Sequence, residues 1–76
     1  MGVPVKPKIL IVDDYDEIRE LVGFILESNM DVQVLQESSG FAAIETLKKN
    51  SDVQMVISDL NMPNGTGIDI LKYLHS

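Results

Sequence analysis

The stretch Ile9-Leu10-Ile11-Val12-Asp13-Asp14 decides the fold of this chain, because an apolar run ends there abruptly in two carboxylates. Consecutive Ile, Leu and Val residues without polar alternation are typical of a strand buried on both faces, as in the middle of a parallel sheet. A shorter apolar run, Met55-Val56-Ile57, is followed closely by Asp59. Carboxylates gathered at strand ends are costly without a positive partner, so the sequence predicts a cation or phosphate site there.

Outward from these two runs, strand and helix patterns alternate. Strands are expected at residues 8–12, 32–35 and 55–57. Helices are expected at 16–27, from an N-cap at Ser38 or Ser39 through Lys49, and at 68–75. We expect Asn29 to end the first helix as a left-handed cap.

Each expected helix has apolar residues at helical spacing, which predicts one face packed on a sheet. These residues are Ile18, Leu21, Val22 and Ile25 in the first helix, Ala43, Ile44 and Leu47 in the second, and Ile68, Leu71 and Leu74 in the third. Gly23 interrupts the first helix at a cost of about 1 kcal/mol relative to Ala. We expect a close approach between helix and sheet at that position.

Alternating strands and helices predict an α/β fold with a parallel sheet and right-handed crossovers. The strand at 32–35 alternates polar and apolar residues like an edge strand, so the first and third strands are expected to be neighbours, in the order 2-1-3. The crossover direction then reverses between them. Ligands of such sheets bind at this switch point, beyond the carboxyl ends of the strands. Asp13, Asp14 and Asp59 should therefore converge.

Composition narrows the classes of function. The 76 residues allow one domain, with residues 1–7 as an N-terminal extension, and the absence of cysteine excludes disulfides and thiolate metal sites. Six basic and twelve acidic residues give a net charge of −6, which argues against nucleic-acid binding. No apolar stretch approaches the ~20 residues of a membrane span, and residues 1–8 lack the apolar core of a signal peptide. We expect a soluble, cytoplasmic protein with no membrane contact.

The pattern Ile-Leu-Ile-Val-Asp13-Asp14, then Ile-Ser-Asp59-Leu-Asn61-Met62-Pro63, then Gly67 closely resembles the receiver domain of bacterial two-component response regulators. The resemblance implies a flavodoxin-like (CheY-like) fold, here limited to three strands and three helices. It implies that Asp59 accepts a phosphoryl group from a sensor histidine kinase or phosphotransfer protein. It further implies a Mg²⁺ ion held by Asp13, Asp14, Asp59 and the carbonyl of Asn61. The chain would then be a signalling module and not an enzyme with turnover.

The chemistry of phosphoryl transfer gives independent reasons for these groups. A carboxylate is a weak nucleophile toward an anionic phosphoryl group, so a divalent cation must neutralise the developing charge. Mg²⁺ prefers hard oxygen ligands and keeps several waters, which suits a few carboxylates and a carbonyl. We prefer Asp14 as a direct ligand, with Asp13 acting partly through water. Pro63 stiffens the following loop, and Gly65 and Gly67 permit positive φ or close backbone approach.

Other interpretations stay open at this point. Asp13 and Asp14 alone could be a helix N-cap. Asp14-Tyr15-Asp16 after a buried strand resembles the paired aspartates of haloacid dehalogenase-type phosphatases, which would make the chain an enzyme. A further alternative is a half-receiver that acts only as an interaction or dimerisation piece.

The sequence also departs from the receiver pattern. A complete receiver continues through two more strands and two more helices, which bear a Ser/Thr and a Lys that contact the phosphoryl group. Here the only lysine after Asp59 is Lys72, on the third expected helix. We therefore expect Mg²⁺ affinity with poor phosphorylation. No fourth strand covers the outer edge of residues 55–57, and an uncovered apolar edge predicts a homo-oligomer formed through it.

Overall fold

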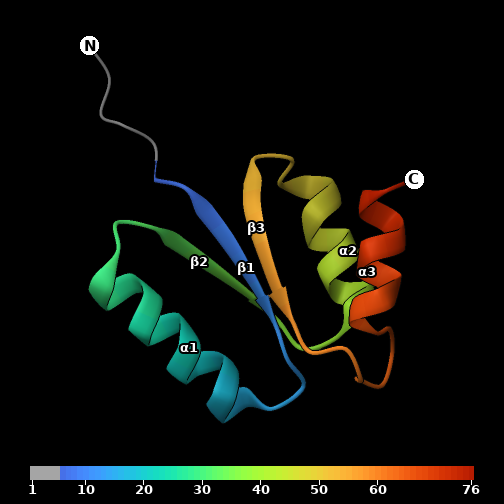
Figure 1. Cartoon of the computed structure of the whole chain (residues 1–76), viewed down its shortest axis with the longest axis horizontal. Coiled ribbons are helices and arrows are strands. Elements are labelled where there is room, and N and C mark those ends of the chain that lie inside the picture. The colour runs from blue at the N-terminus through green and yellow to red at the C-terminus, as the bar shows by residue number, and fades with distance from the viewer. Residues whose placement is uncertain (1–5) are drawn as a thin grey trace.

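Three parallel strands form the centre of the fold, in a computed structural model that describes residues 6–76. The strands are β1 (Lys8–Val12), β2 (Gln33–Glu37) and β3 (Val53–Ser58), and the helices are α1 (Asp16–Asn29), α2 (Gly40–Lys49) and α3 (Gly67–Leu74). The strand order is β2-β1-β3, which confirms the order predicted from the sequence. Helix α1 covers one face of the sheet, and α2 and α3 cover the other (Figure 1).

The central strand is the most deeply buried element. Its residues Ile9–Val12 are all at most 5% exposed, as expected for a strand packed on both faces. Leu10 and Val12 point toward α2 and α3, where they form the main core with Ala43, Leu47, Met62 and Ile70. Ile11 lies on the other face, below Gly23 of α1. Because β1 contributes to both layers, its carboxyl end is held firmly in place.

Two helices begin with side-chain caps. The hydroxyl of Ser39 accepts a hydrogen bond from the N–H of Ala42 at the start of α2, which confirms a capping serine there. Thr66 and Asp69 form a reciprocal capping box at the start of α3. Hydrogen bonds from the backbone N–H and the hydroxyl of Thr66 lower the pKa of Asp69, so the cap is charged at neutral pH.

The predicted left-handed cap at Asn29 is wrong. Asn29 is the last residue of α1, and Met30 follows it in an extended conformation with φ −138°. The amide of Asn29 instead donates to the carbonyl of Ile25 at 2.7 Å. The side chain thus folds back onto its own helix, and the chain leaves α1 through an extended residue without a left-handed cap.

The predicted apolar faces of α1 and α3 are only partly buried. Ile18, Leu21 and Ile25 are half exposed, and the residues that face the sheet are Arg19, Val22, Gly23 and Leu26. In α3, Ile70 is buried instead of Ile68, Leu71 and Leu74. The apolar residues do share one side of each helix, but no other element of residues 6–76 covers the exposed ones.

The ends of the chain complete the outline. Of the predicted N-terminal extension, residues 1–5 lie outside the described part of the chain. Pro7 precedes β1, and its carbonyl accepts a hydrogen bond from the N–H of Gln33 at 2.9 Å. Among residues 6–76, no helix combines the length and apolar composition that crossing a membrane requires.

Candidate metal site at the carboxyl ends of the strands

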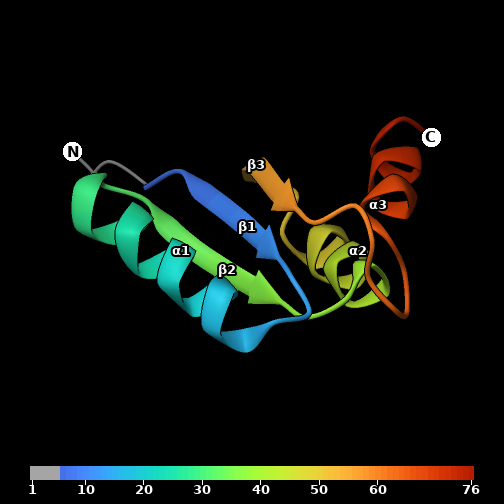
Figure 2. The ribbon, with the colours of Figure 1, turned by 60° about the horizontal axis from the view of Figure 1, so that its bottom comes forward.

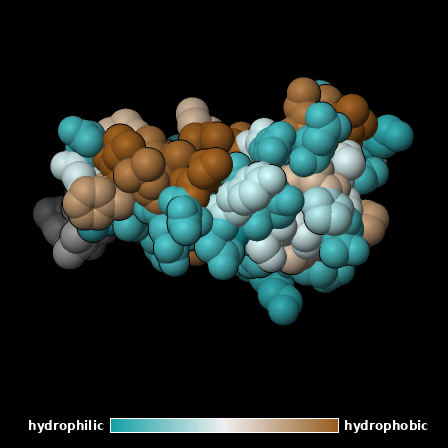
Figure 3. Space-filling model, turned by 90° about the horizontal axis from the view of Figure 1, so that it is seen from below, coloured by the Kyte–Doolittle hydropathy of each residue, from teal (hydrophilic) through white to brown (hydrophobic). Residues whose placement is uncertain are grey.

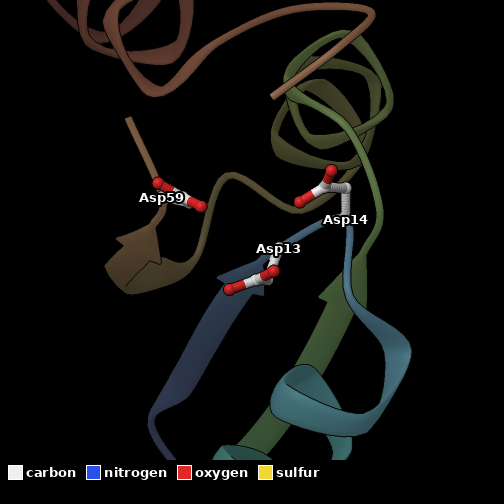
Figure 4. A group of neighbouring side chains, drawn as sticks. All are labelled: Asp13, Asp14 and Asp59. Atoms are coloured by element: carbon white, nitrogen blue, oxygen red, sulfur yellow. The ribbon is translucent and has the colours of Figure 1, made fainter. Parts of the chain in front are cut away.

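The three predicted aspartates meet at one end of the sheet. All three strands point the same way (Figure 2), so the segments that leave β1 and β3 start side by side. The N–H of Asp59 donates to the carbonyl of Val12 at 3.2 Å and joins the two strand ends. One carboxylate oxygen from each of Asp13, Asp14 and Asp59 lies within 4.8 Å of the other two. Figure 4 shows these carboxylates around a common space, so the predicted convergence is confirmed.

Asp13 is fixed by three hydrogen bonds. Its N–H donates to the carbonyl of Glu37 at 3.2 Å, which continues the pairing of β1 with β2. Its carboxylate accepts from the N–H of Tyr15 at 2.9 Å in a tight local turn. Its carbonyl accepts from the guanidinium of Arg19 at 2.8 Å. One carboxylate oxygen of Asp13 is thus already engaged with the backbone.

Asp14 is the most unusual member of the cluster. Its Oδ1 is buried and has no hydrogen-bond partner among residues 6–76. A buried carboxylate oxygen without a partner costs free energy, and native structures rarely tolerate one without a reason. A bound cation is such a reason, while the role of Asp14 as the direct ligand stays a prediction.

Asp59 is the exposed member of the cluster. One of its carboxylate oxygens accepts from the N–H of Asn61 at 3.3 Å, which orients the side chain over the loop. Exposure leaves this carboxylate accessible from solvent. Asn61 therefore lies next to the cluster, while the metal-binding role of its carbonyl stays a prediction.

The loop that carries Asp59 is anchored to the start of α2. Gly65 has φ 103°, and its carbonyl accepts from the N–H of Gly40 at 2.9 Å. A Cβ atom added at Gly40 would lie 2.5 Å from the backbone of Gly65, and one at Gly67 would lie 2.7 Å from the carbonyl oxygen of Asp59. The conformational roles predicted for Gly65 and Gly67 are therefore confirmed. The sequence interpretation missed Gly40, because its partner lies far along the chain.

The phosphatase alternative depends on Asp16, which lies outside the cluster. Its carboxylate is mostly exposed and pairs with Arg19 at 2.7 Å. Lys72 lies in the last turn of α3, on the helix where the sequence placed it.

The donor set fits a Mg²⁺ ion. Three carboxylates supply hard oxygen ligands, and exposure on the side of Asp59 leaves room for the waters that Mg²⁺ keeps. The orphaned oxygen of Asp14 and the charge repulsion among three nearby carboxylates both favour a divalent cation at this position.

Comparison with known proteins gives a consistent result. The family model described as "Response regulator receiver domain" matches residues 9–76. Chemotaxis protein CheY1 of Helicobacter pylori is 35% identical over 69 residues, which cover 91% of this chain and 56% of that protein. Chemotaxis protein CheY-3 of Vibrio cholerae is 38% identical over 69 residues, covering 91% and 52%. The rice two-component response regulator ORR3 is 37% identical over 67 residues, covering 88% and 50%.

Solved structures share the fold. A crystal structure of a signal receiver domain from Vibrio parahaemolyticus superimposes with a TM-score of 0.83 at 24% identity, over 93% of this chain and 53% of the other. The chain spans about half the length of the relatives that it matches.

Proposed function

The chain belongs to the response regulator receiver domain family, and from this we propose that Asp59 accepts a phosphoryl group in a two-component phosphorelay. The donor is the phosphohistidine of a sensor histidine kinase or phosphotransfer protein. The observation that carries the proposal is the convergence of three carboxylates, one of which, Asp14, also has a buried oxygen without a hydrogen-bond partner among residues 6–76. The acceptor lies at the exposed side of this cluster.

Each residue has a distinct part in the proposed reaction. An oxygen of Asp59 forms a P–O bond as the P–N bond of phosphohistidine breaks, and the leaving imidazole nitrogen takes a proton from solvent. A Mg²⁺ ion, when bound, supplies the positive charge that stabilises the transferring group. Asp14 would hold the ion directly and Asp13 partly through water, and Asp59 and the carbonyl of Asn61 would complete the protein ligands.

The module is proposed as a phosphoryl acceptor and not as an enzyme with turnover. A phosphatase would need Asp16 beside Asp14, but Asp16 is engaged with Arg19. We propose a cytoplasmic location with protein partners only, because the net charge of −6 disfavours contact with nucleic acid and with anionic membrane surfaces.

Labelling with acetyl phosphate tests this function. We expect slow, Mg²⁺-dependent incorporation of phosphate, because the ion pairs of residues 6–76 join no lysine to the acceptor Asp59. Asp59→Asn should abolish incorporation. The matched control is Asp52→Asn at the opposite end of β3, where a hydrogen bond from Lys8 lowers the pKa of Asp52; this variant should be labelled like the wild type. Labelling that persists in Asp59→Asn, or turnover of a chromogenic phosphate ester, would contradict the proposal.

A second candidate role, as an interaction piece, is favoured by the edge of β3. This strand, Val53–Ser58, carries no charge or proline, and Met55 and Ile57 are 54% and 38% exposed. Edge strands without such protection pair readily with other chains. A groove of about 220 Å³ runs beside the strand, with Val56 and Leu71 in its lining.

A second copy of this chain fits the edge. Asp59 bonds inward to β1, so by alternation the N–H and C=O of Val56 and Ser58 point outward. Antiparallel pairing centred on Val56 would place Met55 opposite Ile57 of the second copy, with apolar side chains on both faces. Figure 3 also shows hydrophobic surface over α1 and near α3 on one side of the molecule, but the proposed strand pairing does not use it. We propose a symmetric dimer through this edge.

Sedimentation velocity tests the dimer. The wild-type chain should associate as its concentration rises, and Met55→Lys should remain monomeric because a charge would enter the pairing edge. Phe24→Lys is the control, since Phe24 is 69% exposed on α1 and belongs to another element; it should dimerise like the wild type. A monomeric wild-type chain at millimolar concentration, or a dimeric Met55→Lys variant, would refute the edge interface.

A further inference from the structure

Arg19 connects helix α1 to the turn that carries two of the three clustered carboxylates. Its side chain is only 14% exposed, although it bears a full charge. Nη1 donates to the carbonyl of Asp13 at 2.8 Å, Nε to the side-chain oxygen of Gln36 at 3.2 Å, and Nη2 to Asp16 at 2.7 Å. The planar guanidinium is therefore held from three directions, by β2, by its own helix and by the turn.

The contact with Asp13 has a specific geometric effect. The carbonyl of Asp13 belongs to the planar peptide unit that joins Asp13 to Asp14. A hydrogen bond that fixes this oxygen also fixes the plane, and with it the direction in which both side chains leave the backbone. The bond from Tyr15 N–H to the carboxylate of Asp13 restrains the same turn from the other side.

We propose that Arg19 is a positioning residue for the cation site, acting through the peptide plane between Asp13 and Asp14. This inference rests on the proposed Mg²⁺ site. The three acceptors are bound by three different nitrogens of the planar guanidinium. A lysine ammonium also has three N–H donors, but all of them leave one nitrogen, so it cannot reach acceptors placed in this arrangement. The positive charge by itself has the opposite effect, because it repels a bound cation. Variants that remove the planar donor group with or without the charge can therefore distinguish the two effects.

Calorimetric titration of Mg²⁺ into three variants tests the proposal. Arg19→Met should raise the Kd about tenfold, in the range typical of residues that orient metal ligands. Arg19→Lys should raise it similarly, although the charge is kept. In metal-free spectra, the amide signals of Asp14 and Tyr15 should shift in both variants. Leu26→Ala, which weakens the packing of α1 without touching the turn, should bind Mg²⁺ like the wild type.

The outcomes separate this inference from the proposed function. A wild-type chain that binds no Mg²⁺ would overturn both. Wild-type affinity in Arg19→Met or in Arg19→Lys, with Mg²⁺ bound normally by the unmodified chain, would overturn only the positioning role. An equal loss of affinity in Leu26→Ala would also overturn it, because general loosening of α1 would then suffice.

Discussion

Asp14→Asn is expected to change stability and metal binding in opposite directions. Without metal, the variant should be more stable than the wild type by on the order of 1 kcal/mol, because it removes one of three charges within 4.8 Å of each other. With Mg²⁺, it should lose an anionic ligand, and the Kd should rise at least about tenfold, or about 1.4 kcal/mol. Urea unfolding with and without Mg²⁺ measures both effects.

The control for this prediction is Glu20→Gln. Glu20 is exposed on α1 and lies outside the cluster. Glu20→Gln should leave the stabilisation by Mg²⁺ unchanged, because the carboxylate that it removes is not a metal ligand. If Asp14→Asn destabilises the metal-free chain and retains full stabilisation by Mg²⁺, neither the charge repulsion nor the ligand role assigned to Asp14 exists.

Gly65→Ala is expected to unfold most of the population. At φ 103°, an added Cβ atom would lie 2.5 Å from the backbone nitrogen of Phe41, and neither backbone segment can move without breaking the bond between Gly40 and Gly65. The left-handed conformation alone costs roughly 1–2 kcal/mol. A core of this size supplies only about 3–5 kcal/mol in net stability, so the added clash should exceed what remains. Far-ultraviolet circular dichroism measures the loss.

Gly23→Ala is the matched comparison, because Gly23 is also buried. An added Cβ atom there would lie 3.3 Å from the flexible end of Gln36. Alanine improves a helix interior by about 1 kcal/mol, which offsets a small adjustment of that side chain. We expect a change in unfolding free energy within about 1 kcal/mol. A folded Gly65→Ala chain with near-native stability would contradict the account of the loop.

Local pattern was enough to predict the sheet. The apolar run Ile9–Val12 has one physical explanation, a strand with helices on both faces, and the edge character of residues 32–35 then fixed the order. The position of Asp13, Asp14 and Asp59 followed from that order. Residues that directly follow two neighbouring parallel strands lie close together at one edge of the sheet. The helices between the strands contributed only the parallel direction and the handed crossovers.

Contacts between residues far apart in the sequence could not be predicted from local pattern. Gly40 supports the loop only because Gly65 comes within contact of its backbone, and no rule of spacing connects the two positions. The position of Arg19 on its helix indicates partial burial, but it does not indicate which residues its guanidinium contacts. The predicted burial of the apolar faces of α1 and α3 was wrong in part for another reason. Apolar spacing shows which side chains share a helix face, but not whether another element covers that face.

Titration of the isotope-labelled wild-type chain with Mg²⁺, followed by amide resonances, tests the shared cation site most directly. The account predicts that the signals of Asp13, Asp14 and Asp59 shift together and saturate with a single Kd. Exposed acids far from the cluster, such as Asp31, should stay unchanged. Shifts that spread evenly over the exposed acids, or no shift at the three clustered positions, would contradict the account.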